Sequence, residues 1–466
     1  MSGQREGGPA SAASSASAAR IAARSSSLGS GLMTTSTTAQ AKAPGNQGRY
    51  GLQVGRRLAT AAALLVLVPA GTASAMRDSH TTPQSWAATQ IAAVTAKGLM
   101  GTKNPTTFRP NQTLTAQALS NLTFGLQQIL APPVPAAPDP GPPAGLGDPV
   151  PTDPAATGPT TTEPTTTDGT TTVPAPASPT TTPSTPTTPP AVVAKPQKVA
   201  NPAAAVTMAQ LDAQLVDSLG LSGAAAEFAA GAKAAGLKVP ARFGTEVVAR
   251  LLGLRTNHPA PEDGLELLPN DPATRAEAAF SAAAILGFAG DGGAAVAGVQ
   301  SLADGFSLPA LSTWQTRILD TAVSKIGMPY VWGGTSDGPE APFGVHSRGG
   351  YDCSGFVWRV YKLQSYPGEG DLASVIRGRT TYVMSVEVPK SERIGLPDLQ
   401  PGDVLFFGDH GPRSSSAEIY HTAIYLGNTW FIQSSGYGVA LAQLTGYYRQ
   451  KFAWARRPLQ EAGLSG

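Results

Sequence analysis

Residues 349–356 read Gly-Gly-Tyr-Asp-Cys-Ser-Gly-Phe and contain, at Cys353, the only cysteine of this 466-residue chain. Asp352 is a favourable N-cap, and the apolar residues after it recur at helical spacing. Cys353 is therefore expected to open a helix, where the positive end of the helix dipole favours a thiolate. The alternative is a small buried core residue. A capping Asp and a Ser-Gly pair rarely flank such a core position, so we interpret Cys353 as a nucleophile.

A cysteine nucleophile needs a base to take its proton and a third group to orient that base. Of the five histidines, four lie in stretches typical of loops: His80, His258, His346 and His410. The fifth, His421, begins the run His-Thr-Ala-Ile-Tyr-Leu, which is typical of a buried strand and would hold an imidazole rigidly. A histidine that opens a strand is more often structural than catalytic. The lone cysteine nevertheless leads us to predict His421 as the base.

The next apolar run, residues 430–434, predicts the return strand of a hairpin. Side chains alternate between faces, so the length of the turn decides what lies beside His421. A three-residue loop pairs Ala423 with Gln433 and makes Gln433 a diagonal neighbour of His421. A two-residue loop would place Ser434 opposite His421. We prefer Gln433, because its amide oxygen can accept from one ring nitrogen and leave the other one free.

Four motifs follow one another in the C-terminal third: Pro-Tyr-Val-Trp-Gly-Gly at 329–334, Asp-Cys-Ser-Gly-Phe at 352–356, Leu-Gln-Pro-Gly-Asp-Val-Leu-Phe-Phe at 399–407 and His-Thr-Ala-Ile-Tyr-Leu-Gly-Asn at 421–428. With these motifs, the chain from about Trp314 to Pro458 resembles the NlpC/P60 family of cell-wall cysteine peptidases. The resemblance implies a papain-like α+β fold. It also implies that Cys353 is the nucleophile, His421 the base and Gln433 the orienting residue, at a position where the family often has a second histidine.

The resemblance also implies residues that contact the substrate. Tyr330 corresponds to the family's active-site tyrosine, although a cleft-lining aromatic is the alternative, and we expect Asp352 and Ser354 to line the substrate site beside the nucleophile. The backbone N–H of Cys353 is a candidate oxyanion donor. Two segments depart from the family. Residues 335–348 are longer than usual and are expected to form a lip over the cleft, and the basic segment 377–381 lacks a glutamine that often follows it.

We predict a catalytic domain over residues 305–466, with a helix from Thr316 to Ile326 and the Cys353 helix packed on an antiparallel sheet. The expected strands cover residues 403–407, 421–426 and 430–434. No metal or other cofactor is predicted, because there is a single cysteine and the histidines lack paired ligand spacing.

The N-terminal part predicts export. Arg56 and Arg57 precede an apolar run that is too short for a stable membrane anchor, and Ala-Ser-Ala at 73–75 is typical of a signal-peptidase site. We therefore interpret residues 1–75 as a disordered tail plus a secretory signal, with translation from Met33 as an alternative start and an uncleaved anchor as the alternative reading. Exported cysteines are usually paired, so an unpaired one is either a spare thiol or a working nucleophile, and the surroundings of Cys353 favour the second.

Small helical modules and a linker are expected between the signal and the catalytic domain. Residues 76–130 resemble a divergent S-layer homology repeat, with a helix, a Phe-Arg-Pro loop and a second helix after Leu114-Thr115. Residues 131–200 are rich in Pro and Thr and predict an extended, disordered linker. The Ala-rich region 201–304 predicts helices and repeats the pattern weakly at 267–278. These modules either bind a secondary cell-wall polymer or form a helical spacer.

These features predict a secreted, wall-associated peptidoglycan hydrolase. The resemblance implies cleavage of stem peptides, typically between D-γ-glutamate and a diamino acid, through a thioester. The rival interpretation is a wall-binding protein whose peptidase-like domain is inactive or held shut. The net charge of +2 gives no reason to expect a nucleic-acid partner, and no integral membrane association is expected after signal cleavage.

Overall fold

The computed structural model describes residues 85–101, 107–131, 196, 198–258, 264–291, 293–344 and 346–464. The predicted tail and signal over 1–75, Met33, His80 and nearly all of the predicted linker 131–200 lie outside these ranges. Among the residues that are described, no helix is both long enough and apolar enough to span a membrane.

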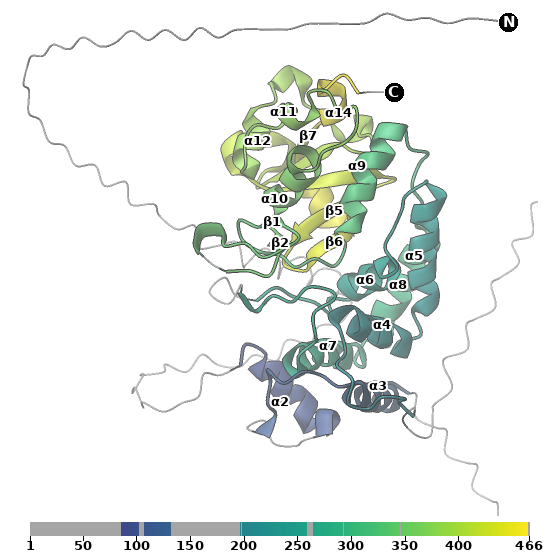
Figure 1. Cartoon of the computed structure of the whole chain (residues 1–466). Coiled ribbons are helices and arrows are strands. Elements are labelled where there is room, and N and C mark those ends of the chain that lie inside the picture. The colour runs from purple at the N-terminus through teal and green to yellow at the C-terminus, as the bar shows by residue number, and fades with distance from the viewer. Residues whose placement is uncertain are drawn as a thin grey trace, which may run out of the picture. The chain divides into compact units, whose positions relative to one another are not determined.

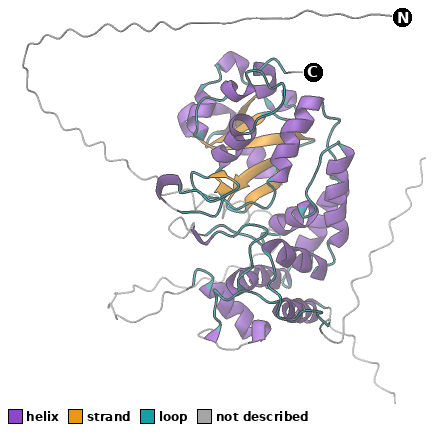
Figure 2. Cartoon of the chain, in the orientation of Figure 1, coloured by secondary structure: helices purple, strands orange, loops and turns teal. Residues whose placement is uncertain are grey.

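The C-terminal part is built on a five-stranded antiparallel sheet with the strand order β6-β5-β4-β3-β7. Figures 1 and 2 show this sheet with helices around it. In chain order the strands are β3 (Val404–Gly408), β4 (Ile419–Gly427), β5 (Trp430–Ser435), β6 (Gly438–Gln443) and β7 (Phe452–Arg456). Helix α10 (Cys353–Trp358) packs against β4 and β5. The predicted α+β architecture, with a helix on an antiparallel sheet, is confirmed.

The β4–β5 hairpin has the predicted register but a different turn. Ile424 pairs with Ile432, as a three-residue loop requires. The turn itself has two residues, Asn428 and Thr429, whose φ angles of 47° and 67° lie in the left-handed region used by type I′ hairpins. The register shifts between Tyr425 and Gly427. The bulge adds one residue to the two of the turn, so the side chains of His421 and Gln433 still lie on the same face of the hairpin.

Shorter elements complete the C-terminal part. Helix α9 (Thr313–Ser324) begins three residues earlier and ends two residues earlier than predicted, because Ser312 and Gln315 form a capping box ahead of it. The remaining elements are β1 (Thr335–Ser336), β2 (Gly350–Tyr351), α11 (Leu372–Val375), α12 (Thr381–Val386), α13 (Gly446–Lys451) and α14 (Pro458–Glu461).

The described residues before Thr313 are helical. Their helices are α2 (Ala88–Ala96), α3 (Ala116–Leu130), α4 (Met208–Ser218), α5 (Ser222–Ala234), α6 (Phe243–Leu251), α7 (Arg275–Phe288) and α8 (Ala294–Asp304). Three of them, α3, α4 and α7, start in the same way: the hydroxyl of a threonine N-cap accepts from the backbone N–H three residues later. These caps are Thr115, Thr207 and Thr274.

A closed ring of backbone hydrogen bonds joins these three helix starts. The N–H of Leu114 donates to the carbonyl of Ala273 (2.8 Å), Ala273 donates to Val206 (2.7 Å), and Val206 donates to Leu114 (3.0 Å). Each helix start thus supplies one donor and one acceptor. The three segments are equivalent in structure, which agrees with the weak repeats seen in the sequence, although residues 131–200 separate the first segment from the other two in the chain.

The helical part and the sheet share one hydrophobic core. Phe228 and Phe306 meet Trp430 of β5 edge-on, with ring centroids 5.7 and 5.1 Å away. Arg242 donates to the carbonyls of Ser324 (3.0 Å) and Ile326 (3.1 Å). The predicted division into 201–304 and 305–466 therefore separates segments of sequence whose side chains pack together.

Candidate active site

Cys353 is the first residue of α10, as the sequence predicts. Its predecessor Asp352 is the N-cap, and the Asp352 carboxylate accepts from the backbone N–H of Gly355 at 2.5 Å. The side chain of Cys353 is 8% exposed. Its sulfur lies 3.4 Å from the hydroxyl of Thr381, so the thiol sits against the start of α12.

The structure corrects the expectation that the helix start favours a thiolate. Burial, followed by the negative charge of Asp352, raises the pKa of Cys353 to about 11. The hydroxyl of Thr381 and the backbone N–H groups of Thr422 and Ser354 lower the pKa by less than that. The thiol of the unliganded protein is therefore neutral at neutral pH.

His421 and Gln433 meet across the β4–β5 hairpin, as the parity argument predicts. The Nε2 atom of His421 lies 2.6 Å from the Oε1 atom of Gln433. Burial lowers the pKa of His421 to about 4, against smaller raising effects of Gln433 and Asp352. The imidazole is thus neutral at neutral pH and can accept a proton. Because the backbone N–H of Thr422 reaches the sulfur of Cys353, the start of β4 lies directly beside the Cys353 thiol.

The Tyr330 motif runs alongside the cysteine motif. Tyr330 forms a parallel bridge with Tyr351, and the N–H of Val331 donates to the Tyr351 carbonyl at 3.2 Å. This pairing places Tyr330 beside Tyr351, which precedes Cys353 by two residues in the sequence. The N–H of Gly333 donates to the Asp352 carboxylate at 3.0 Å, which ties the two motifs together a second time.

Sequence reasoning missed Arg379, which bonds the residues on both sides of Cys353. Arg379 donates to both carboxylate oxygens of Asp352 (3.1 and 3.2 Å), to the hydroxyl of Ser354 (2.7 Å) and to the carbonyl of Gly333 (2.9 Å). Asp352 and Ser354, predicted to contact substrate, are thus engaged with Arg379. The sequence marked the basic segment 377–381 but not its target, which lies 27 residues away in the chain.

Sequence reasoning also missed Tyr448, which lies behind Gln433. The Nε2 amide of Gln433 donates to the Tyr448 hydroxyl at 2.6 Å. Tyr448 belongs to the short helix α13, where no residue pattern indicates a functional role. Its place beside Gln433 follows only from the packing of α13 against the sheet.

The other described histidines lie elsewhere. His258, in the helical part, is 2% exposed and pairs with Glu277 at 3.0 Å. His410 is exposed and pairs with Glu418 at 2.6 Å. His346 is exposed in the predicted lip. Across the described residues, no three histidine, cysteine or acidic side chains converge to hold a metal ion.

Hydrogen bonds and an ion pair tie down the described residues of the predicted lip, 335–344 and 346–348. Strands β1 and β2 pair at its two ends, and Glu340 accepts from the N–H groups of Thr335 (2.7 Å) and Ser336 (3.2 Å). Arg348 forms a two-pronged ion pair with Asp271 of the helical part, with both distances 2.7 Å. The lip thus connects the cysteine motif to the helical part.

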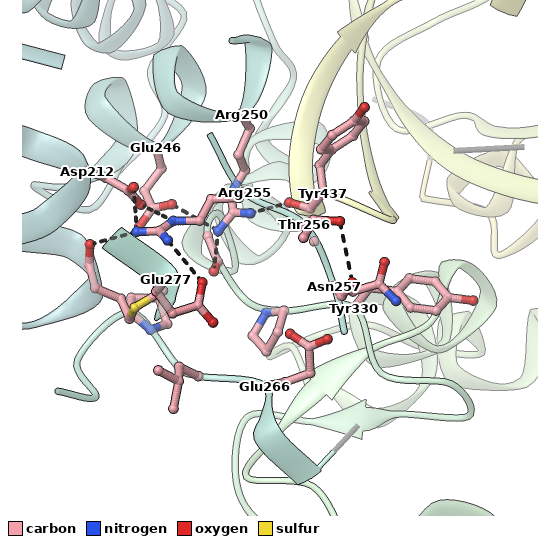
Figure 3. A pocket seen from close by; sticks show the side chains of 16 residues that line it. Asp212, Glu246, Arg250, Arg255, Thr256, Asn257, Glu266, Glu277, Tyr330 and Tyr437 are labelled. Carbon is pink, nitrogen blue, oxygen red and sulfur yellow. Dashed lines mark hydrogen bonds and ion pairs between the residues drawn. The ribbon is translucent and has the colours of Figure 1, made fainter. Parts of the chain in front are cut away.

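A charged pocket lies where the helical part meets the tyrosine motif (Figure 3). On the helical side, Arg255 pairs with Asp212 at 2.6 Å and Glu277 at 3.4 Å. Tyr330 and Tyr437 line the opposite side. The helical part therefore builds part of the surroundings of the tyrosine motif and is more than an attached module.

Comparison with known proteins identifies two segments. Residues 327–457 match the NlpC/P60 family, and residues 76–115 match the S-layer homology domain. The chain is 28% identical over 143 residues to the probable peptidoglycan endopeptidase LytE of Bacillus subtilis, over 30% of this chain and 34% of that protein. It is 30% identical over 142 residues to the murein DD-endopeptidase MepH of Escherichia coli, over 30% of this chain and 44% of that protein.

Among solved structures, an NlpC/P60 family protein from Bacillus cereus shares 26% sequence identity, with a TM-score of 0.24 over 33% of this chain and 42% of that one. The matched region spans less than half the length of each of these three proteins. The sequence matches and the four motifs agree on the same C-terminal region. The chain therefore carries an NlpC/P60 family domain at residues 327–457, distantly homologous to peptidoglycan endopeptidases, and an S-layer homology domain at residues 76–115.

Proposed function

We propose that this protein is a secreted, wall-associated cysteine peptidase that cleaves peptidoglycan stem peptides during wall remodelling or daughter-cell separation. One observation carries the proposal: Cys353 opens a capped helix beside a strand on which His421 is hydrogen-bonded to Gln433 at 2.6 Å. This is the nucleophile, base and orienting group that acyl transfer needs. The NlpC/P60 match supports peptidoglycan as the substrate class.

In the proposed mechanism, both groups start neutral. As the Cys353 sulfur attacks the scissile carbonyl, His421 takes the thiol proton, and the amide oxygen of Gln433 stabilises the resulting imidazolium. The backbone N–H of Cys353 is placed to stabilise the oxyanion. His421 then gives its proton to the leaving amine, and a thioester remains. A water molecule, deprotonated by His421, hydrolyses the thioester and regenerates the thiol.

The bond we propose is the one between D-γ-glutamate and the diamino acid of the stem peptide, which the family resemblance favours. The name of MepH points to a second class, the D,D bond of peptide cross-links. Mass spectrometry of the products distinguishes the two bonds. Cleavage of uncross-linked stem peptides supports the first bond, and release restricted to cross-linked dimers supports the second.

The helical part is proposed to hold the enzyme on the wall. The S-layer homology match at 76–115 supports binding of a secondary cell-wall polymer, and the ring of three equivalent helix starts supports assigning residues 198–258 and 264–288 to the same module. Together with the predicted signal, this supports an extracellular, wall-associated location.

The second candidate is a wall-binding protein whose peptidase site is shut. The high pKa and the 8% exposure of Cys353 favour it, because a buried neutral thiol is a weak nucleophile. Digestion of purified wall by the full secreted chain separates the two. Wild-type protein should release stem-peptide fragments and Cys353→Ala should not, while both pellet equally with the wall. Equal release by the two proteins would refute the enzymatic proposal, and wall binding without any release would favour the second candidate.

A further inference from the structure

The third residue of the site is an amide, and an amide has two different ends. With its oxygen toward His421, Gln433 accepts a hydrogen bond from Nε2–H and leaves Nδ1 unprotonated. With its NH₂ group toward His421, it requires the opposite tautomer, with the proton on Nδ1. The orientation of one buried side chain thus decides which ring nitrogen can act as the base.

Gln433 is 3% exposed, so both ends of its amide need partners inside the protein. The oxygen lies 2.6 Å from His421 Nε2, and the NH₂ group donates to the hydroxyl of Tyr448, also at 2.6 Å. Without the hydroxyl, the orientation seen here would leave a buried donor unsatisfied. The reversed orientation would leave only a carbonyl oxygen unsatisfied, which proteins tolerate better.

The ring of Tyr448 is held by the same aromatic cluster that holds the histidine. It meets Phe431 edge-on at 4.9 Å and Phe407 at 5.5 Å between ring centroids. Phe407 also lies 5.6 Å from the imidazole of His421. His421 and Tyr448, the two partners of the Gln433 amide, therefore both pack against Phe407, which fixes their positions relative to each other.

We propose that Tyr448 is a positioning residue of this site: its hydroxyl accepts from the Gln433 amide, keeps the amide oxygen on His421, and so selects the Nε2–H tautomer of the base. The proposal rests on the proposed Cys353–His421–Gln433 chemistry and deepens it. Burial raises the pKa of Tyr448 to about 12, so the phenol stays protonated over the working range of the site.

The variant Tyr448→Phe removes only the hydroxyl and keeps the ring packing. We expect kcat on a soluble muropeptide to fall about tenfold, the effect of one buried hydrogen bond, with little change in KM. The matched control is Tyr447→Phe, because the neighbouring hydroxyl bonds Tyr420 (3.1 Å) and not Gln433. This control should keep wild-type kcat. Equal loss in both variants would overturn the proposal.

Coupling to Gln433 separates positioning from general packing. In a Gln433→Ala background, Tyr448→Phe should cause no further loss, because there is no amide to orient. In a Gln433→Glu background the hydroxyl donates to a carboxylate oxygen and has no amide to orient, so Tyr448→Phe should leave the tautomer of His421 unchanged there. An additive loss of kcat in the Gln433→Ala background would show that the hydroxyl acts only through stability, and would refute the proposal.

The tautomer can be read without any substrate. With ¹⁵N-labelled histidine in the full chain, His421 should show Nε2–H in the wild type and a shift toward Nδ1–H in Tyr448→Phe. An unchanged tautomer would overturn the role of Tyr448. If the wild type cleaves no wall, the proposed function fails, but this spectrum still decides whether Tyr448 sets the tautomer.

Discussion

His421 on β4 and Gln433 on β5 are offset by two residues in the strand register, and their side chains still meet at 2.6 Å across the hairpin. The pair depends on the bulge between Tyr425 and Gly427, which compensates for the two-residue turn. With the turn at Asn428 and Thr429 and no bulge, the pairing of Gly427 with Trp430 would continue along the strands and put Gly436 opposite His421. The contact between His421 and Gln433 therefore depends on the bulge at the end of β4 as well as on the two side chains.

The base and its partner should differ in how much activity depends on them. His421→Ala should remove nearly all hydrolysis, since it removes the imidazole that is proposed to take the thiol proton. Gln433→Ala should leave a measurable remnant, because it orients the imidazole without transferring the proton. Release of fragments from purified wall measures both. His410→Ala, at an exposed position, is the control, and a loss as large as that of His421→Ala would contradict the assignment.

The acid limb of the pH profile should lie low. Burial lowers the pKa of His421 to about 4, so the imidazole is unprotonated and competent above that pH and becomes protonated as the pH falls through about 4. We expect kcat/KM on a soluble muropeptide to be lost near pH 4, and not near the ordinary histidine value of about 6.5. A loss of activity near pH 6.5 would contradict this prediction, because it would mean that His421 is exposed to water in the form of the enzyme that reacts.

The reactivity of the thiol should follow its raised pKa. Because burial holds the pKa of Cys353 at about 11, iodoacetamide should modify it more slowly at pH 7 than an ordinary peptide cysteine. The rate should keep rising with pH toward about 11. Cys353 is the only cysteine, so labelling of the whole chain reports on this site alone. A plateau of the rate near neutral pH would show instead a preformed thiolate–imidazolium pair.

Arg379 should act through Asp352. Arg379→Met removes the positive charge that compensates the Asp352 carboxylate beside the thiol, so the pKa of Cys353 should rise further and kcat/KM should fall about tenfold. Arg377→Met is the matched control, since Arg377 is exposed and its backbone N–H, which the substitution keeps, donates to Glu387. Because of the raised pKa, iodoacetamide should also modify Cys353 more slowly in Arg379→Met. Adding Asp352→Asn removes the negative charge and should restore that alkylation rate. Failure to restore it would assign Arg379 a purely structural role.

Arg250 and Arg348 are two of the arginines that link the helical part to the C-terminal part, and their replacement should cost different amounts of stability. Arg250 is 9% exposed, donates to the carbonyls of Gly327 (2.7 Å) and Tyr437, and pairs with Glu246, which is 1% exposed. Arg250→Ala leaves that carboxylate buried without its partner and should cost about 3 kcal/mol of unfolding free energy. Arg348→Ala, at the exposed pair with Asp271, should cost less than about 1 kcal/mol.

Denaturant unfolding of the full chain measures both changes as shifts of the midpoint. Equal costs for the two arginines would contradict the buried interface. A separate early transition in the wild type would show that the helical part unfolds by itself.

The sequence by itself determined the local features. The capping Asp352 ahead of Cys353, the Thr115 cap and the strand-like runs around His421 and Gln433 depend on neighbours within a few residues. Patterns of that range can be seen in a single sequence. The diagonal relation of His421 and Gln433 was predicted from side-chain alternation and a three-residue loop. The structure gives the same register through a two-residue turn and a bulge, which the sequence did not indicate.

Only the tertiary structure decided the rest, because it brings together residues that are far apart in the chain. The bond from Arg379 to Asp352 and the bond from Gln433 to Tyr448 depend on how loops and a short helix pack on the sheet. The hydrogen-bonded ring joins Leu114 to Val206 and Ala273, which the long Pro/Thr-rich segment separates from Leu114 in the sequence. The pKa of Cys353 is set by how deeply the folded chain buries the thiol, and desolvation is a property of the whole packed surrounding, which no local motif contains.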